Sequence, residues 1–262
     1  MKKFEILDCT LRDGGYYNNW NFDKKTIQEY LEAISRSQIK FVELGFRFND
    51  TNKNKGLTAY TEDKLINKLN IPNNIRIGIM INASDLLSEY KNKVSLKVLK
   101  RIFPSSISKK IYFVRIACHH EEVFKLNILF NYLKKFNIRV FINIMQISEL
   151  EENKLSQICG FLKNKKVYAL YLADSLGALT LKKMKNLIKT LKQYWDKEIG
   201  LHAHDNLKFA LKNSIFAIQN GVHWIDSTLT GMGRGPGNLK TEEIIKFSSI
   251  YKEVKEFKFI VK

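Results

Sequence analysis

The fold of this chain is decided by the stretch LHAHDN, residues 201–206, which ends a short apolar run. Successive side chains of a β-strand point to opposite faces, so His202 and His204 point to the same side. At the end of a strand, two neutral imidazoles can share one divalent metal ion. The alternative is that both histidines are polar residues that fill the mouth of a barrel. The rest of the chain decides between these interpretations.

Length and composition indicate one large globular domain. The chain has 262 residues, 45% of them hydrophobic, with 3 prolines and 13 glycines. A length near 250 is typical of a single α/β barrel. No run reaches the roughly 18 apolar residues of a membrane span, and the N-terminal apolar run contains an acid, unlike a signal peptide. Three scattered cysteines form no paired framework, so we expect a cytoplasmic protein.

The net charge of +18 admits three explanations. It could mark a nucleic-acid binder, attract anionic substrates, or reflect the Lys-, Asn- and Ile-rich composition of the source. The lysines are spread through the helical segments, as in Lys182, Lys183 and Lys185, and are not interleaved with aromatic residues in one block. We therefore expect neither a nucleic acid nor a membrane as partner, and consider a phosphorylated or nucleotide-linked substrate.

Short apolar runs alternate with longer amphipathic segments along the chain. This pattern predicts eight strands, at residues 4–9, 41–44, 75–81, 111–116, 140–145, 169–173, 199–203 and 224–227. It predicts eight helices, at residues 24–36, 61–69, 83–101 with a break near Val94, 121–136, 149–163, 181–194, 207–220 and 241–254. Asp23 is expected to cap the first helix, and Gly221 to close the seventh. The alternation predicts an α/β fold, a single-domain (β/α)8 TIM barrel.

The active site of such a barrel lies at the carboxyl ends of its strands. The unusual residues of this chain gather there. They are TLRDGG after the first strand (10–15), ELGFR at the second (43–47), DSLG at the sixth (174–177), the histidine pair at the seventh and GMGRGPGN after the eighth (231–238).

Asp13 can join the two histidines in one metal site. The first and seventh strands are separated only by the eighth, and neighbouring strands lie about 4.8 Å apart. A carboxylate and two imidazoles leave positions open for water and a bidentate ligand. Asn238 can approach the same metal, although the glycine-rich segment before it can equally be a tight turn into the last helix.

Arg12 stands next to this carboxylate. A buried guanidinium is costly unless it meets negative charge. Glu43, one strand over, can orient Arg12 and leave its other face for a developing oxyanion of the substrate. A purely structural Arg12–Glu43 ion pair is the alternative.

These motifs together resemble the HMG-CoA-lyase-like (DRE-TIM) metallolyase superfamily. The resemblance rests on DCTLRDG (8–14), Glu43, HAHDN (202–206) and GMGRGPGN (231–238), which occur in the family's order. The superfamily includes HMG-CoA lyase, isopropylmalate and homocitrate synthases, and 4-hydroxy-2-oxovalerate aldolase. The segment DSLG is closest to the aldolase branch, and LRDGGYYNNW (11–20) resembles aldolase-like members of that branch.

The resemblance implies a divalent metal, Mn²⁺ or Mg²⁺ with Zn²⁺ or Co²⁺ as alternatives, bound by Asp13, His202 and His204, with Asn238 as a further candidate. Arg12 would hold the enolate oxygen, and Ser175 with the metal would hold the carboxylate of a 2-oxoacid. The metal ligands Asp13 and His202 would thereby also bind substrate. Arg12, Glu43 and Tyr16 would be the catalytic residues.

The implied activity is that of a metal-dependent aldolase or lyase. It would make or cleave a C–C bond of a 4-hydroxy-2-oxoacid through a metal-bound pyruvate-type enolate. Its partners would be a small-molecule 2-oxoacid and an aldehyde, which the lysine excess suggests is phosphorylated or sugar-derived. Enzymes of this kind are often homo-oligomers, commonly dimers. A Claisen-type acyl-CoA synthase or lyase is one alternative, and a non-catalytic basic binding barrel is another.

Two features depart from the aldolase pattern. The general base of the aldolases is a histidine at the place of Tyr16, and a phenol with a pKa near 10 is a poor base at neutral pH. The second feature is length. We expect residues 1–262 to form one pyruvate-carboxyltransferase/aldolase-like catalytic domain. This domain lacks the C-terminal regions that contact an aldehyde dehydrogenase partner in the aldolases or regulate the synthases.

Overall fold

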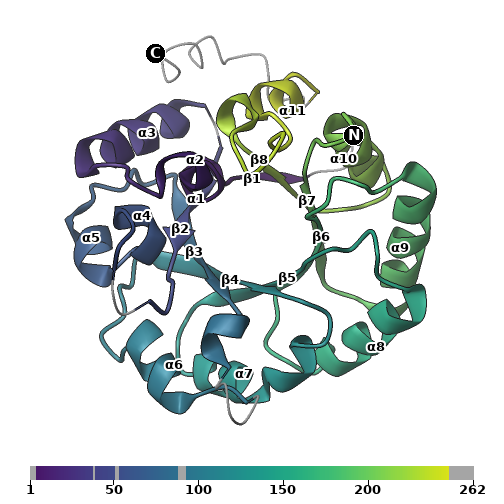
Figure 1. Cartoon of the computed structure of the whole chain (residues 1–262), viewed down its shortest axis with the longest axis horizontal. Coiled ribbons are helices and arrows are strands. Elements are labelled where there is room, and N and C mark those ends of the chain that lie inside the picture. Colours follow the sequence, from purple (N-terminus) through teal and green to yellow (C-terminus); the bar gives the residue numbers. More distant parts are fainter. Residues whose placement is uncertain (1–3, 38, 51–52, 88–92, 248–262) are drawn as a thin grey trace.

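A closed barrel of eight parallel strands forms the centre of the protein. The computed structural model describes residues 4–37, 39–50, 53–87 and 93–247. The strands pair in chain order from β1 to β8, and β8 pairs with β1 to close the ring. Figure 1 shows this ring along its axis, with the helices outside it. The predicted (β/α)8 TIM barrel is confirmed.

The regular elements follow the predicted alternation. The strands are β1 (Glu5–Asp8), β2 (Phe41–Phe46), β3 (Arg76–Asn82), β4 (Ile111–Cys118), β5 (Arg139–Ile144), β6 (Ala169–Asp174), β7 (Glu198–Ala203) and β8 (Trp224–Ser227). The α-helices are α1 (Thr10–Asp13), α2 (Gly15–Asn18), α3 (Lys24–Arg36), α4 (Leu57–Tyr60), α5 (Asp63–Lys68), α6 (Leu96–Ile102), α7 (Asn127–Leu133), α8 (Glu152–Leu162), α9 (Leu181–Tyr194), α10 (Ala210–Gln219) and α11 (Thr241–Phe247). Short 3-10 turns are η1 (Ser84–Leu86), η2 (Val123–Lys125) and η3 (Leu229–Gly231).

Every predicted strand is present, with ends shifted by no more than two residues, and α3 and α9 match their predicted ranges. Asp23 caps α3, since its side chain accepts a hydrogen bond from the Thr26 N–H at 2.7 Å. Gly221 follows α10 with a φ of 87°, a conformation that glycine adopts at helix ends. Both local predictions are confirmed.

The helices differ from prediction where the chain is most irregular. The segment 83–101 divides into η1 and α6, with Leu87 bridged to Val94 between them, so the predicted break near Val94 is confirmed, although the first piece is only a 3-10 turn. Residues 121–136 divide into η2 and α7. The last predicted helix, 241–254, is seen as α11 to Phe247, and its remainder lies outside the described residues. The helices α1, α2 and α4 were not predicted, because a single turn carries no readable periodicity.

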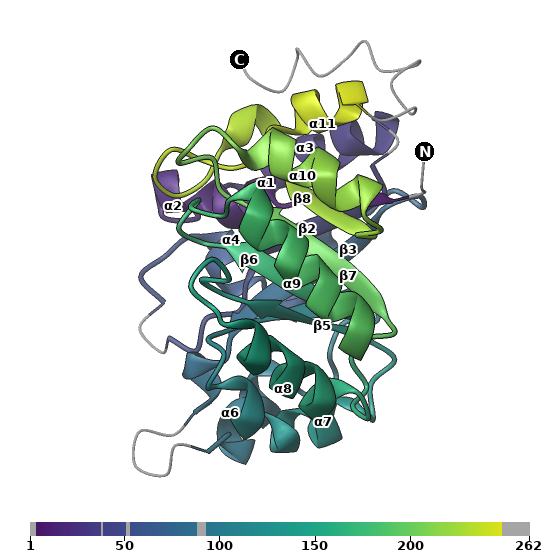
Figure 2. The same ribbon diagram turned by 90° about the vertical axis from the view of Figure 1, so that its right-hand side faces the viewer.

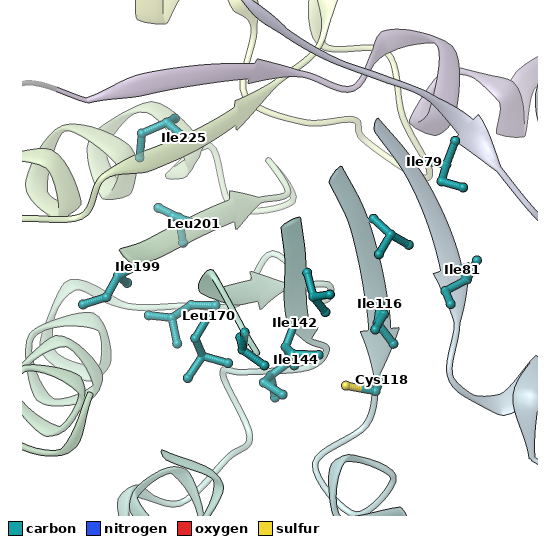
Figure 3. Close-up of a cluster of buried hydrophobic side chains, with 14 of the residues drawn as sticks. Ile79, Ile81, Ile116, Cys118, Ile142, Ile144, Leu170, Ile199, Leu201 and Ile225 are labelled. Carbon is teal, nitrogen blue, oxygen red and sulfur yellow. The ribbon is translucent and has the colours of Figure 1, made fainter. Parts of the chain in front are cut away.

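Aliphatic side chains on the outer faces of the strands hold the helices in place. Figure 3 shows Ile79, Ile116, Ile142 and Leu201 among a continuous layer contributed by strands β3 to β8. Such β-branched side chains pack well on a pleated surface. Cys9, Cys118 and Cys159 are buried and free. In the described part of the chain, no helix has both the length and the apolar character needed to span a bilayer.

Aromatic rings fill the amino-terminal half of the barrel interior. Phe113 and Phe141 stack with ring centroids 5.0 Å apart, and Phe141 lies 5.8 Å from Tyr171. Glycines on the neighbouring strands leave room for these rings. A Cβ on Gly78 would lie 2.0 Å from Phe113, and one on Gly200 would lie 2.5 Å from Tyr171. The glycine two residues before His202 therefore makes room for the core beneath the metal candidates.

A layer of buried ion pairs lies on the carboxyl-end side of these rings. Arg115 of β4 is fully buried, and its Nε and Nη2 atoms donate to the two carboxylate oxygens of Glu43 at 2.9 and 2.6 Å. Its Nη1 donates to Asp226 of β8, and its guanidinium carbon lies 4.8 Å from the ring centroid of Tyr171. One guanidinium thus ties β2, β4, β6 and β8 together across the barrel.

We expect Glu43→Gln to lower the free energy of unfolding by about 3–5 kcal/mol at pH 7, because it leaves buried guanidiniums without their countercharge. Burial raises the pKa of Glu43, but Arg115 and Arg12 outweigh this and hold the pKa below its usual 4.5. The stabilisation from ionised Glu43 is therefore fully present above pH 4.5 and is lost as the pH falls below that value. The difference in unfolding free energy between wild type and variant should become smaller there.

Urea unfolding at several pH values measures this difference. Glu29→Gln, which breaks only the exposed pair with Lys25, is the matched control and should change stability by less than about 0.5 kcal/mol. Equal effects of the two substitutions would contradict a stabilising role for the buried layer.

Candidate active site

The short helix α1 places Arg12 and Asp13 over the mouth of the barrel. It begins directly after β1, where the Thr10 N–H donates to the Asp8 carboxylate at 2.9 Å. The Thr10 hydroxyl accepts from the Leu229 N–H at 2.9 Å, and the Trp20 indole donates to the Arg12 carbonyl at 2.8 Å. Both ends of α1 are therefore fixed. In Figure 1, α1 lies at the edge of the strand ring beside β1.

Asp13, His202 and His204 form a compact group. One ligand atom from each lies within 4.8 Å of the others, and all three residues are buried. His202 Nε2 is 3.3 Å from a carboxylate oxygen of Asp13. Among the described residues, this is the one cluster of three or more His, Cys, Asp or Glu side chains with such spacing. Two imidazole nitrogens and a carboxylate oxygen suit a divalent metal that keeps open positions for a ligand.

The electrostatics of this group favour metal binding. Burial raises the pKa of Asp13, but Arg12 and His202 outweigh it and hold the pKa well below the usual range. Burial and the neighbouring His202 lower the pKa of His204 to about 4. At neutral pH the group therefore offers an ionised carboxylate and a neutral His204, as metal ligation requires.

Asp226 fixes the orientation of His202. Its Oδ2 atom lies 2.8 Å from His202 Nδ1, and the same carboxylate accepts from Arg115. Arg115 and His202 lower the pKa of Asp226 against the opposing effect of burial, so Asp226 is the acceptor and Nδ1 carries the proton. Burial lowers the pKa of His202, but Asp13 and Asp226 outweigh this effect and raise the pKa, so a metal would displace a proton from His202. With Nδ1 held by Asp226, the Nε2 atom faces Asp13. This arrangement is typical of metal-binding histidines.

Arg12 has one unused donor. Its Nε donates to Glu43 Oε2 at 2.7 Å, and its Nη1 pairs with Asp13. Its Nη2 is buried and has no hydrogen-bond partner among the described residues. An unsatisfied buried donor of this kind costs stability and calls for an explanation. Glu43 thus orients Arg12 as predicted, and the free Nη2 is available to an acceptor atom of a ligand.

Asn238 contacts the carboxylate of Asp13. Its Nδ2 donates to Asp13 Oδ2 at 2.5 Å and to the Met232 carbonyl at 3.1 Å, while its Oδ1 is buried without a partner among the described residues. A Cβ on Gly233 would lie 2.3 Å from the Asn238 amide, so this approach requires glycine. In this arrangement Asn238 orients Asp13. Direct metal ligation would need Oδ1 to turn toward the cluster.

Ser175 and Tyr16 lie on two sides of the same mouth. Ser175 follows β6, is partly buried, and accepts from the Gln146 N–H at 3.3 Å. Tyr16 is 45% exposed, and its ring centroid lies 4.8 Å from that of Trp20. Partial burial raises the pKa of Tyr16 above its usual 10, although Arg12 opposes the shift. The phenol is therefore protonated at neutral pH and offers a hydrogen-bond donor.

Our sequence interpretation overlooked Arg115 and Asp226. Each is a single charged residue inside an apolar strand, in IYFVRIAC (111–118) and WIDS (224–227). That isolation was the available signal, because a lone charge in a buried strand requires a partner. The sequence does not say which partner, since the two residues lie 111 positions apart.

Comparison with known proteins identifies the family of this chain. The family model described as HMGL-like matches residues 3–255. The 4-hydroxy-2-oxovalerate aldolase of Carboxydothermus hydrogenoformans is 26% identical over 252 residues, covering 93% of this chain and 70% of that protein. The protein of the same name from Geobacillus genomosp. 3 is 27% identical, covering 92% and 68%. The chain thus spans about two thirds of the length of these relatives.

Solved structures show the same barrel. The N-terminal domain of a "putative aldolase" from Bacteroides vulgatus has a TM-score of 0.78 and 34% identity, covering 93% of this chain and 79% of that one. HMG-CoA lyase from Bacillus subtilis has a TM-score of 0.77 at 16% identity, covering 94% and 86%, and shares the fold. The family match spans nearly the whole chain, and the motif residues converge on one mouth. This chain therefore belongs to the HMGL-like family.

Proposed function

We propose that this protein is a divalent-metal-dependent aldolase, a carbon–carbon lyase that makes or cleaves the C3–C4 bond of a 4-hydroxy-2-oxoacid. The observation that carries the proposal is the free, buried Nη2 of Arg12 beside the Asp13–His202–His204 cluster. A positively charged hydrogen-bond donor beside a candidate metal site can stabilise a reaction in which negative charge develops on an oxygen atom of the substrate. The names of the relatives support the same chemistry.

Asp13, His202 and His204 would hold the ion, with Mn²⁺ or Mg²⁺ favoured by the family and Zn²⁺ or Co²⁺ as alternatives. The donor set fits, since its atoms converge within 4.8 Å, Asp13 is ionised and His204 is neutral, and the ion would displace the proton of His202. When bound, the ion supplies Lewis-acid polarisation of the 2-oxo group. Asn238 would hold Asp13 in position, or join the ligands through its Oδ1 atom.

The protein's own residues would handle the charge and the proton. During cleavage, the electrons of the C3–C4 bond move toward the 2-oxo group, and Arg12 Nη2 donates to the oxygen on which charge collects. Glu43 is a positioning residue, because it contacts Arg12 and Arg115 below the mouth. The Ser175 hydroxyl would donate to the substrate carboxylate. Tyr16, protonated at neutral pH, is suited to donate a proton to the aldehyde oxygen when the bond forms. In the cleavage direction, solvent would accept the C4 hydroxyl proton.

The reaction partners would be a 2-oxoacid such as pyruvate and an aldehyde. We place the enzyme in the cytoplasm, which the three buried free cysteines support, because a reducing compartment keeps thiols free. A homo-oligomer, most simply a dimer, is part of the proposal on the ground that symmetric oligomers are common among enzymes.

The first test is metal content and pyruvate release. Protein loaded with Mn²⁺ should release pyruvate from 4-hydroxy-2-oxovalerate, and Asp13→Asn and His202→Ala should lose metal and reduce kcat/KM by about a hundredfold or more. His223→Ala removes a partly exposed histidine that contacts Glu198 and is the matched control. Metal would be measured by mass spectrometry, and pyruvate by a coupled assay.

A wild type without bound metal, or unchanged activity in both site variants, would overturn the proposal. Release of free thiol from acetyl-CoA plus a 2-oxoacid would instead support the Claisen-type alternative. Salt-sensitive binding to nucleic acid without metal would support the non-catalytic binding barrel.

A second prediction concerns Asp226 as a positioning residue for the metal. Asp226→Asn should weaken Mn²⁺ binding by about 10- to 100-fold, because His202 loses the partner that fixes its orientation. Glu43→Gln is the matched control. It also breaks a pair with Arg115 but does not contact His202, so it should weaken Mn²⁺ binding much less. Titration calorimetry gives both dissociation constants, and equal losses would assign the effect to general loosening of the barrel.

A further inference from the structure

A loop after β8 crosses the mouth of the barrel. We call residues 228–240 the β8 loop. Its Leu229 N–H donates to Thr10, its Asn238 amide donates to Asp13, and its Gly237 carbonyl accepts from the Asp205 N–H at 2.9 Å. The loop is therefore anchored to the ends of both β1 and β7. Figure 2 shows it on the same side of the barrel as α1 and α2.

Arg234 lies in the part of this loop farthest along the chain from either end. Its Nη2 donates to the Ser175 carbonyl at 3.3 Å, so the guanidinium lies beside the segment that follows β6. Its positive charge also reaches Tyr16, where it slightly opposes the upward shift of the pKa that burial causes, and His204, where it adds slightly to the downward shift caused mainly by burial. Arg234 is exposed, and within the described ranges no carboxylate pairs with it. An exposed cation without a countercharge therefore faces the mouth between Ser175 and Tyr16.

The backbone around Arg234 is shaped to present this side chain. Gly235 and Gly237 have φ values of 63° and 92°, which side chains with a Cβ rarely adopt. A Cβ on Gly235 would meet nothing within 4 Å, so the backbone conformation, and not crowding, explains the glycine there. Between Gly233 and Gly237, Arg234 is the one long side chain.

With a divalent ion and the carboxylate of a 2-oxoacid bound, the mouth of the barrel would retain one uncompensated positive charge. The connected buried network holds two guanidiniums and three carboxylates, from Arg12, Arg115, Asp13, Glu43 and Asp226. Asp174 lies outside it, since its carboxylate accepts from the amides of Ala178 and Leu179 in its own turn. His202 contacts Asp13 and Asp226 and is neutral when it binds a metal. The network is then one unit negative, and a divalent ion makes it one unit positive. The carboxylate of a 2-oxoacid cancels that charge, and Arg234 remains.

We propose that Arg234 binds a second anionic group of the substrate, a carboxylate or phosphate on the acceptor side of the scissile bond. The substrate is then a 4-hydroxy-2-oxoacid whose tail is anionic. This inference rests on the proposed function. Breaking the C3–C4 bond moves its electron pair toward the 2-oxo group, the C4 hydroxyl proton passes to solvent, and C3 takes a proton back from solvent. The products are pyruvate and an aldehyde that carries the anionic group. The net charge of +18 favours the approach of such a polyanion.

A binding experiment tests Arg234 without requiring turnover. The probes are 2-oxoglutarate, with a second carboxylate, and 2-oxopentanoate, with a neutral tail. Neither has a 4-hydroxyl group to permit cleavage. Calorimetry on the Mn²⁺-loaded protein should show about tenfold or greater preference for 2-oxoglutarate. Arg234→Gln should abolish most of this preference, and Arg234→Lys should retain part of it. Lys189→Gln on α9 removes one exposed positive charge and should leave the preference intact.

A turnover experiment distinguishes carboxylate from phosphate. Pyruvate release is compared for 4-hydroxy-2-oxoacids whose tails end in a methyl group, a carboxylate or a C5 phosphate. The anionic tail with the larger kcat/KM relative to the methyl tail identifies the group, and Arg234→Gln should reduce that ratio by about 10- to 100-fold.

The outcomes separate the two proposals. An Arg234→Gln variant that loses affinity equally for both binding probes would show that Arg234 holds the 2-oxoacid carboxylate, and would overturn the second-anion assignment. An unchanged preference would overturn it as well. A preference that depends on Arg234, without pyruvate release from any of the three substrates, would support the anion site and overturn the proposed aldol cleavage.

Discussion

The rest of this structure depends on the buried ion pairs of Arg115. A guanidinium fully removed from water is tolerable only when carboxylates surround it, and here Glu43 of β2 and Asp226 of β8, the two strands that flank β1, pair with it across the barrel. The face of Tyr171 covers it from a third direction. Arg115 and its two carboxylates come from β4, β2 and β8, so the network can form only when the ring has closed. The ion pairs therefore link correct closure of the barrel to the charge balance of its interior.

The same two carboxylates also organise the candidate site. Glu43 shares its oxygens between Arg115 and Arg12, and Asp226 shares its own between Arg115 and His202. The donor expected to meet the substrate and one expected metal ligand are thus held by a common central cation. A loss at any point of this network leaves a buried charge without a partner, which is more costly than replacing the whole network by apolar residues. A substitution in this network therefore changes stability together with the position of the side chain that its carboxylate holds, Arg12 for Glu43 and His202 for Asp226.

Features of the fold and of the site were predictable from the sequence when the residues that determine them lie close together along the chain or follow from the order of the strands. The strands were recognisable because parallel strands buried on both faces are nearly continuous apolar runs. The Asp13–His202–His204 group followed from topology, because β1 and β7 both pair with β8. The helix α1 was not predicted, since one turn has no period to detect. Arg115 was missed for a different reason, since its partners are set only by barrel register and lie 72 and 111 residues away.

The mouth of the barrel has a polar side and an apolar side. This division affects how strongly the guanidinium of Arg12 can interact with a negative charge. Above the layer of ion pairs formed by Glu43 and Arg115, the polar side chains come from the β1 end and from β6 to β8. On the other side, β2, β3 and β4 present Phe46, Met80 and Ala117, all buried in one apolar cluster. The guanidinium carbon of Arg12 lies 5.8 Å from the ring centroid of Phe46, at the boundary between these halves. An apolar wall keeps water away from one side of the guanidinium, and a charge acts more strongly where the surroundings screen it less. A hydrated guanidinium would lose much of that effect, so the role proposed for Arg12 depends on this apolar wall as well as on the neighbouring charges.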